Sequence, residues 1–568
     1  MRQQLDPISL QIMWTRLISI ANRGAATLLR TAFSTVVGSA EDYKYMVTDS
    51  RGDALALSDG GSPEFVVTFP KSLRAMLDVF PLHTLSPGDV LVTNDPWLCA
   101  GHANDVHLAT PVFRRGRVVA FSGSVIHLAD IGGRYGAYDA KECFEEGLCL
   151  PPLKLFRNGE PVSEVFRILE ANVRVPEMQI GDIHAMVAAN EVGVQLLNQF
   201  MDEYDLDDLD DLSTTVQSKV EDVMRNAIEA LPDGSYEHET RVDGYDIDVR
   251  IRSRTTISGS NVTVDFAGTS PQTSRAAVNV VLNMTEAQVP VPFKALLAPH
   301  IPWNEGTRRP IRVVAPVGSI LNAVRPAAVF SRAMISVLLI DHILGSLAQV
   351  LPERVLAESG TRWMLMCDRS PMNGRRVQAG FWQAGAMGAA HDRDGPNAKF
   401  FPIMAAHTPV EVFERIMGLT IKAKTIRPDS GGPGTYRGGC SQLIELTNPG
   451  ETRVDFQVWN PRVRFPASGL FGGHGGAPGM AIKGREPITD GRFSLEPGDE
   501  VALYTPGGGG YGDPMAREPS RVLDDVLDGY VSIGRARSDY GVAIRDGQVL
   551  SSKTRALRER GRKRGKTP

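Results

Sequence analysis

The chain has 568 residues, of which 42% are hydrophobic and 22% charged, a balance typical of a globular protein of roughly two to four domains. Its formal net charge of -5 argues against nucleic acid as the main partner, because phosphate binding needs a concentrated basic face. The N-terminus has no apolar signal core. The most apolar long stretch, residues 327–351, contains charged residues and is therefore expected to be a buried helix rather than a membrane span.

Cysteine usage fits a reducing compartment. The cysteines are odd in number and no two have CxxC spacing, which disfavours a zinc ribbon, a thioredoxin-like motif and a disulfide framework. We therefore expect a cytoplasmic protein. The cysteines stand at positions 99, 143, 149, 367 and 440.

Helix and strand signals alternate in the first part of the chain. Asp6, followed by proline, is typical of a helix start, and the helical spacing after it predicts a helix to about residue 32. Two long helices are predicted at 182–203 and 213–231, with Asp182 and Ser213 as their caps. Shorter elements are predicted as strands at 43–48, 89–93 and 118–126 and as a helix at 72–80.

The pattern then shifts toward strands and glycine. Strands are predicted at 246–251 and 262–266, and helices at 277–298 and 328–350. From about residue 425 glycine-rich stretches predict loops between short strands. We expect a mixed α and β (α+β), multidomain fold. Its expected parts are an α/β region at 1–233, an α+β middle region at 234–425, a mainly β region at 426–550 and a basic disordered tail at 551–568.

Histidine and aspartate gather in one short part of the sequence. His102, Asp105 and His107 fall within six positions after a predicted strand, and His127 and Asp130 stand at the end of another. Adjacent strands would bring both groups together. Imidazole and carboxylate ligands suit a divalent zinc, manganese or iron ion, and a mixed shell usually leaves positions open for water.

From the residues alone two interpretations of this cluster stay open. Histidine–aspartate pairs often serve as plain hydrogen-bonded structure, and one His-x-x-Asp is more often structural. The local density favours a metal site, because three of the 11 histidines fall between residues 102 and 127. Glu142 and Glu146 are interpreted either as lining a cleft or as surface carboxylates at a helix end. Walker A is absent, and the glycine spacing near residue 432 is wrong for a dinucleotide fingerprint.

Motifs along the chain resemble those of the hydantoinase B/oxoprolinase family. Residues 93–105, TNDPWLCAGHAND, look like its N-D-P-x-x-G-x-x-H-x-x-D signature, and residues 127–133, HLADIGG, look like its H-H-A-D-[IV]-G-G. Residues 264–272, VDFAGTSPQ, match almost letter for letter. Similar segments continue in the expected order at 146–155, 181–190, 429–439 and 540–542. The likeness therefore spans about residues 7–545.

The resemblance implies the metal-binding catalytic subunit of an ATP-dependent cyclic-amide hydrolase of the hydantoinase, oxoprolinase or lactamase type. In such systems ATP with Mg²⁺ is held by a hydantoinase A-type subunit, which phosphorylates the substrate. A hetero-oligomer with two copies of each subunit is expected. Two alternatives remain: a subunit of an ATP-dependent ketone carboxylase of the acetone or acetophenone type, and a noncatalytic scaffold for the ATP-binding partner.

The family's metal ligands correspond to His102, Asp105 and His127, and a fourth aligns with Asp42. The segment around Asp42 departs from the family's E-R-x-D-F-S pattern, and Lys44 stands where the serine is usual. A cation there is expected to depress nearby pKa values and to change the preferred substrate charge. Zinc, manganese and iron(II) all suit these ligands.

The resemblance does not identify the general base. His107 and Asp130 are the catalytic candidates, and Asp130 is also expected to orient a histidine ligand. Leu128 replaces the second histidine of the H-H-A-D motif, so neither hydantoin nor oxoproline can be assumed as substrate. The metal is expected to activate a water or enol oxygen, or to polarise a carbonyl. No nucleic acid or membrane partner is expected.

Overall fold

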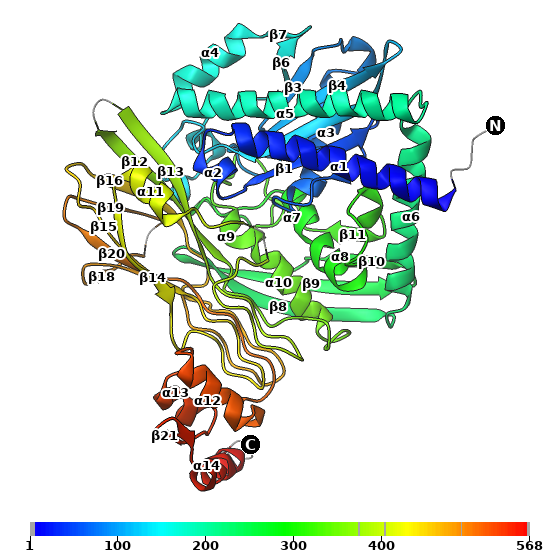
Figure 1. Cartoon of the computed structure of the whole chain (residues 1–568). Coiled ribbons are helices and arrows are strands. Elements are labelled where there is room, and N and C mark those ends of the chain that lie inside the picture. The colour runs from blue at the N-terminus through cyan, green and yellow to red at the C-terminus, as the bar shows by residue number, and fades with distance from the viewer. Residues whose placement is uncertain (1–5, 373–374, 403–404, 490, 565–568) are drawn as a thin grey trace.

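The computed structural model describes residues 6–372, 375–402, 405–489 and 491–564. Its N-terminal part is built on a seven-stranded sheet in the order β2-β1-β5-β4-β3-β6-β7 (Figure 1). β1 pairs antiparallel with β5, and β5 with β4. The strands are β1 (Tyr43–Asp49), β2 (Ala54–Leu57), β3 (Val90–Thr93), β4 (Asp105–Arg114), β5 (Arg117–His127), β6 (Leu153–Arg157) and β7 (Glu160–Pro161).

Long helices cover this sheet. α1 (Pro7–Thr31) and α5 (Pro176–Glu203) lie side by side over it (Figure 1). Tyr45 points from the sheet into the core that they share, while α3 (Phe65–Val79) packs into a second core. The remaining helices of this part are α2 (Thr35–Gly38), α4 (Ser163–Asn172) and α6 (Asp210–Glu229).

The helix caps show where local sequence signals succeed and fail. Asp6 caps α1 as predicted, accepting hydrogen bonds from the backbone N–H groups of residues 8 and 9. Asp182 does not cap α5. The helix begins six residues earlier, at Pro176, because proline is suited to a first helical position. Buried Asp182 instead accepts from the N–H groups of Phe33 and Ser34, at 2.7 and 3.1 Å. It thus ties the segment between α1 and α2 to the second turn of α5.

A second layer contains residues 234–347. Its four-stranded sheet has the order β11-β10-β9-β8. The predicted helix at 277–298 is two helices, and the one at 328–350 is shorter and divided. The elements are β8 (Gly234–Gly244), β9 (Ile247–Ser258), β10 (Asn261–Asp265), α7 (Leu282–Gln288), α8 (Pro290–Leu297), β11 (Ile311–Val314), α9 (Ala333–Ser336) and α10 (Leu338–Leu347).

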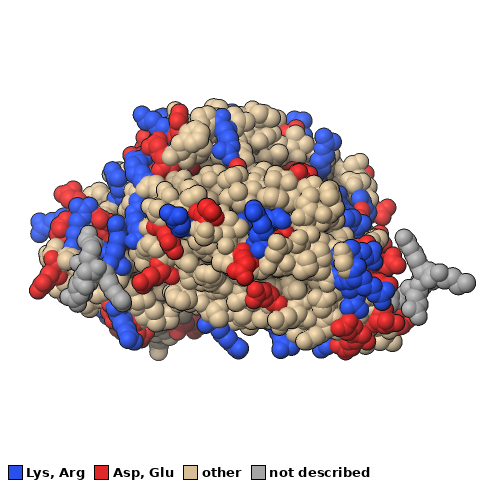
Figure 2. Space-filling model, turned by 90° about the horizontal axis from the view of Figure 1, so that it is seen from above, with Lys and Arg blue, Asp and Glu red and all other residues tan. Residues whose placement is uncertain are grey.

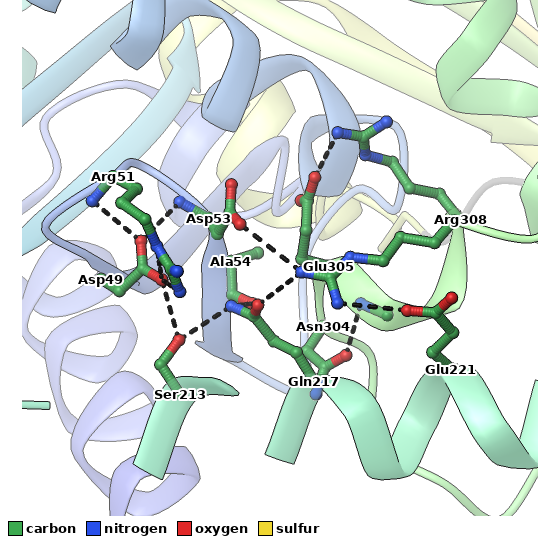
Figure 3. A network of polar contacts seen from close by, with 12 residues as sticks. Asp49, Arg51, Asp53, Ala54, Ser213, Gln217, Glu221, Asn304, Glu305 and Arg308 are labelled. Carbon is green, nitrogen blue, oxygen red and sulfur yellow. Dashed lines mark hydrogen bonds and ion pairs between the residues drawn. The ribbon is translucent and has the colours of Figure 1, made fainter. Parts of the chain in front are cut away.

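A polar network joins the first two layers (Figure 3). Ser213, predicted as a helix cap, lies inside α6 and donates a hydrogen bond of 2.9 Å to Asp49 at the end of β1. One turn later Gln217 donates to the Ser213 hydroxyl and accepts from Arg309, at 2.9 and 2.8 Å. Asn304 also contacts α6, through the carbonyl of residue 216 at 3.3 Å. The network fixes α6 between the two sheets.

Two antiparallel sheets form the C-terminal β part, in the orders β13-β12-β16-β19 and β14-β15-β20-β17-β18. They share one core, which includes Trp363, Phe381 and Phe456. Because β12 and β13 pair within this unit, its strands begin near residue 360, and the boundary expected at residue 425 stays a prediction. The strands are β12 (Arg362–Met372), β13 (Arg375–Ala384), β14 (Thr420–Ile426), β15 (Gln442–Thr447), β16 (Val454–Trp459), β17 (Met480–Lys483), β18 (Glu486–Pro487), β19 (Arg492–Leu495) and β20 (Glu500–Tyr504); α11 (Val410–Met417) packs on them.

The glycine-rich stretches are ordered extended segments that run beside one another (Figure 1). Their backbones exchange hydrogen bonds, such as Gly432 N–H to the Gly508 carbonyl at 2.8 Å. A Cβ on Gly438 would stand 2.0 Å from the Gly508 carbonyl oxygen, so a side chain cannot enter. The prediction of simple loops missed this packing, because glycine content alone does not distinguish a turn from close backbone contact.

The chain ends in a small helical unit below the glycine-rich segments (Figure 1). The predicted disordered tail is wrong for residues 551–564, which form α14. This helix is anchored because Thr554 is buried and accepts from Ala543 N–H, and Arg558 donates to the Tyr540 carbonyl, both at 3.1 Å. The other elements here are α12 (Pro519–Leu527), α13 (Ile533–Asp539), β21 (Ile544–Arg545) and β22 (Gln548–Val549).

The face seen in Figure 2 carries both signs of charge. Lysine and arginine are interspersed with aspartate and glutamate, and broad uncharged areas separate them. This distribution lacks the concentrated basic face that a nucleic acid would need. Within the described ranges, none of the helices combines the length and the apolar character needed to cross a bilayer.

Candidate metal centre

Three potential metal ligands meet where β4 begins and β5 ends. Asp105 is the first residue of β4 and pairs directly with His127, the last residue of β5. His102 enters from the loop before β4. Their ligand atoms all lie within 4.8 Å of one another, and all three residues are buried. Adjacent strands therefore bring these residues together, as expected from the sequence.

The separations suit a common cation. His102 Nε2 lies 2.9 Å and His127 Nδ1 lies 3.2 Å from Asp105 Oδ1. Ligands held about 2.0–2.1 Å from a tetrahedral metal are roughly 3.3 Å apart. His102 Nε2 is buried and, among the described residues, has no hydrogen-bond partner despite its proximity to Asp105. A nitrogen that accepts no hydrogen bond has a free lone pair, which is what a metal ligand needs.

The fold also sets the protonation of His102. Its Nδ1 lies 3.1 Å from the Phe330 carbonyl oxygen, so Nδ1 carries the proton and Nε2 keeps its lone pair. Burial, reinforced by the nearby Arg332 guanidinium, lowers the pKa of His102 to about 4 despite the opposing effect of Asp105. The imidazole is therefore neutral at pH 7, the state in which it binds metals.

Asp105 is held as a carboxylate. Burial alone would raise its pKa, but His102 and the Arg332 guanidinium hold the pKa of Asp105 well below its usual range. Arg332 makes a buried ion pair with the second carboxylate oxygen. Gly101 leaves room for this arginine: a Cβ there would stand 2.7 Å from the arginine Cδ, and its φ of +94° disfavours other residues.

The fourth expected ligand, Asp42, lies beside the triad. Its Oδ2 is 3.9 Å from His127 Nδ1, and its Oδ1 accepts a 2.9 Å hydrogen bond from Ser62. Lys44 does not line the same cavity. It donates to the Gly60 carbonyl at 2.9 Å and borders a separate cavity of about 530 Å³. Burial lowers the pKa of Lys44 to about 8.

The two histidines of the triad line a small cavity whose other walls come from distant parts of the chain. Glu64, Arg332 and Arg362 bring charged groups, and the two tryptophans Trp382 and Trp459 bring indole rings. The space open to a water-sized sphere is about 20 Å³, room for roughly one water. Asp42, Phe65, His102, His127, Ala333, Met364 and Met366 complete the lining.

No motif in the sequence pointed to Glu64. It is 3% exposed, and its Oε2 has no hydrogen-bond partner in the part of the chain that the structure describes. Burial raises the pKa of Glu64 to about 7; Arg362 opposes this shift and Asp42 adds to it. A carboxyl with a pKa near neutrality in a cavity can both accept and return a proton. No spacing pattern connects Glu64 to the histidine motifs.

Neither catalytic candidate from the sequence lines this cavity. His107 is buried on aromatic rings with its Nδ1 2.8 Å from the Ser72 hydroxyl, and burial lowers the pKa of His107 to about 3. Asp130 binds Arg174, accepting from its backbone N–H at 2.6 Å and from its side chain, rather than a histidine. Their catalytic roles remain predictions, and the geometry favours Glu64 as the proton acceptor.

Glu146 binds the backbone segment that contacts His102. It is neither at the surface nor in the cavity lining, the two interpretations offered by the sequence. Its Oε1 accepts from the N–H groups of Val329 and Phe330 at 2.6 and 2.8 Å. The Phe330 carbonyl in turn faces His102 Nδ1. Burial raises the pKa of Glu146 to about 8 against the effect of these hydrogen bonds, so the carboxyl is mostly protonated at pH 7.

Replacement of Glu146 by alanine is expected to weaken metal binding by roughly 10- to 100-fold, because the carbonyl that orients His102 loses its support. Glu146→Gln keeps a neutral acceptor for the same two N–H groups and serves as the matched control. Metal affinity is measured by competition with a chelator. Equal affinities of the wild-type and alanine proteins would show that Glu146 does not position the ligand.

Comparison with known proteins identifies the family. Residues 6–514 match Hydantoinase B/oxoprolinase, and the chain belongs to this family. It is 29% identical over 588 aligned positions to the B component of a putative D-/L-hydantoinase of Pseudomonas sp. (strain NS671), covering 98% of both chains.

Two solved structures share the fold. The crystal structure of the ATP-dependent caprolactamase from Pseudomonas jessenii has a TM-score of 0.90 and 28% identity, over 98% of this chain and 100% of that chain. A nucleotide-free acetone carboxylase structure has a TM-score of 0.89 over 99% of this chain and 84% of that chain. Its identity is 20%, so this second likeness concerns the fold alone.

Proposed function

We propose that this chain is the metal-binding catalytic subunit of an ATP-dependent cyclic-amide hydrolase. The buried triad of His102, Asp105 and His127, whose two histidines line one small cavity, carries the proposal. The similarity over full length to a putative hydantoinase component and to a caprolactamase supports amide opening as the reaction class. We further propose Asp42 as a fourth ligand and zinc, manganese or iron(II) as the ion.

The partner in this proposal is a hydantoinase A-type subunit that binds ATP with Mg²⁺, in a hetero-oligomer with two copies of each chain. Two relatives are each named as one subunit of a larger enzyme, a hydantoinase and a caprolactamase, which supports a partner of some kind. The cysteines are free thiols, which fits the cytoplasmic location that we propose. They are Cys99, Cys143, Cys149, Cys367 and Cys440.

The roles of the residues follow from their positions. Burial keeps His102 neutral, and the Phe330 carbonyl fixes its tautomer. Arg332 helps to hold Asp105 ionised. When bound, the divalent cation would supply Lewis-acid polarisation and would lower the pKa of a water. Glu64 faces the same cavity, where it accepts a proton from the attacking water and returns it to the leaving group. The tryptophans and methionines exclude bulk water from these groups.

The principal alternative is a subunit of an ATP-dependent ketone carboxylase, supported by the shared fold of acetone carboxylase. A second alternative, a noncatalytic scaffold, accounts less well for buried His102, whose Nε2 lone pair meets no donor from the described residues.

The reaction is tested by ATP turnover of the complex with its partner. For the amide hydrolase we expect ATP hydrolysis stimulated by cyclic amides and independent of bicarbonate. Turnover that requires both a ketone and bicarbonate would contradict the amidohydrolase and establish the carboxylase. Turnover that persists with a metal-free chain would support the scaffold instead.

A further inference from the structure

Unpaired nitrogen donors gather at the metal cavity. Besides His102 Nε2, five buried N–H donors on residues that line it have no hydrogen-bond partner within the described residues. They are Nε of Arg332, Nε and Nη1 of Arg362, and Nε1 of both Trp382 and Trp459. Buried polar groups are almost always satisfied, and each exception needs an explanation. A concentration of donors in one cavity points to a ligand that is rich in acceptors.

Arg362 is the centre of this donor group. It is the first residue of β12 and is only 5% exposed. The two arginines of the cavity differ: Arg332 is paired with Asp105, whereas Arg362 makes no ion pair with a carboxylate of the described chain. A buried guanidinium that makes no ion pair is costly, because its charge has lost water. The Glu64 carboxyl is near enough for Arg362 to lower its pKa, but no ion pair joins the two among the described residues.

The orientation of Arg362 is set by aromatic stacking. Its guanidinium carbon lies 4.9 Å from the centre of the Trp382 ring. Stacking fixes the plane of the fork, so less freedom is lost when it forms hydrogen bonds. A fixed fork recognises planar or tetrahedral oxyanions through two parallel N–H bonds.

We propose that Arg362, together with the indole N–H groups of Trp382 and Trp459, binds an oxyanion of the substrate beside the metal ligands. This proposal rests on the proposed function and specifies its substrate class. The oxyanion has two possible sources with similar chemistry: a phosphoryl group that the partner transfers from ATP, or a carboxylate carried by the substrate.

The volume of the cavity limits the size of the ligand that can enter without a change in the wall. About 20 Å³ admits roughly one water, so an oxyanion of four or five heavy atoms needs its wall to move. Met364 and Met366 form part of that wall, and methionine is the side chain most able to adapt its shape. Binding of an oxyanion is therefore expected to shift these methionines and to change the fluorescence of the adjacent tryptophans.

The test uses the metal-loaded complex with its partner and titrates inorganic phosphate and acetate separately by calorimetry. We expect one of these anions to bind, and Arg362→Gln to weaken its binding at least tenfold while metal content stays unchanged. Arg362→Lys, which keeps the charge without the fork, should lose part of the affinity. Phosphate binding without acetate binding identifies a phosphoryl group, and the reverse identifies a carboxylate.

Arg325→Gln is the matched control, since Arg325 also stacks on a tryptophan, Trp97, at 4.4 Å but is 43% exposed and lies outside the cavity. It should bind the anion as the wild type does. The proposal is overturned if neither anion binds metal-loaded wild type, or if Arg362→Gln and Arg362→Lys bind it unchanged. Absence of metal from the wild type would instead reject the proposed function itself.

Discussion

Replacing Asp105 by asparagine is expected to abolish metal binding and to lower the stability of the metal-free chain by about 3–5 kcal/mol. The carboxylate is buried at the meeting point of His102 and His127, and it is the partner of Arg332. Its removal leaves a buried guanidinium without a counterion. Removing one partner of a buried ion pair destabilises the fold more than replacing both partners. Metal content is measured by elemental mass spectrometry, and stability by urea unfolding in a chelator.

A double variant separates the two effects. Asp105→Asn combined with Arg332→Met removes both charges, so its unfolding free energy should lie well above that of the single variant. It should still bind no metal. If the double variant is as unstable as the sum of both single changes, the ion pair is not the source of the loss. Retention of metal by Asp105→Asn would show that another residue supplies the carboxylate ligand.

Glu64→Gln is expected to reduce turnover of the complex by roughly 10²- to 10⁴-fold, the usual contribution of a general acid or base. Metal content should not change, because Glu64 is not part of the ligand triad. The measurement is kcat with saturating substrate and ATP. Glu353→Gln, which removes one exposed carboxylate elsewhere, is the matched control and should leave kcat unaltered.

The pH dependence provides a second readout of Glu64. Because the pKa of its carboxyl is raised to about 7, the base form gains population as the pH rises through that value. Turnover should therefore increase from pH 5 to 8. A bound cation stabilises the carboxylate, so the inflection should lie at or below about pH 7. The rising limb should vanish in Glu64→Gln, and its persistence would assign the base to another residue.

The triad could be predicted from the sequence because short-range rules place it. His102 and Asp105 are close along the chain, and antiparallel pairing of the strands that carry Asp105 and His127 brings the third ligand opposite the second. The same reasoning located most helices and strands. It misplaced the start of α5, because a carboxylate at residue 182 also has uses outside capping.

The rest of the cavity could not be predicted. Glu64, Arg332 and Arg362 come from three separate regions, and only packing of the β-rich part against the N-terminal sheet brings them together. Arg332 left one signal, a charge within an apolar stretch. Glu64 and Arg362 left none, because a single charged residue is most often solvated.

Metal content tests the account most directly. We would measure it by elemental mass spectrometry on the chain alone and with its partner, for wild type, His102→Ala and His300→Ala, which removes an exposed histidine outside the site. The account predicts close to one divalent metal per chain in the wild type and in His300→Ala, and loss of that metal in His102→Ala. A wild-type chain without metal in both preparations, or a His102→Ala variant that retains it, would contradict the assignment of this site.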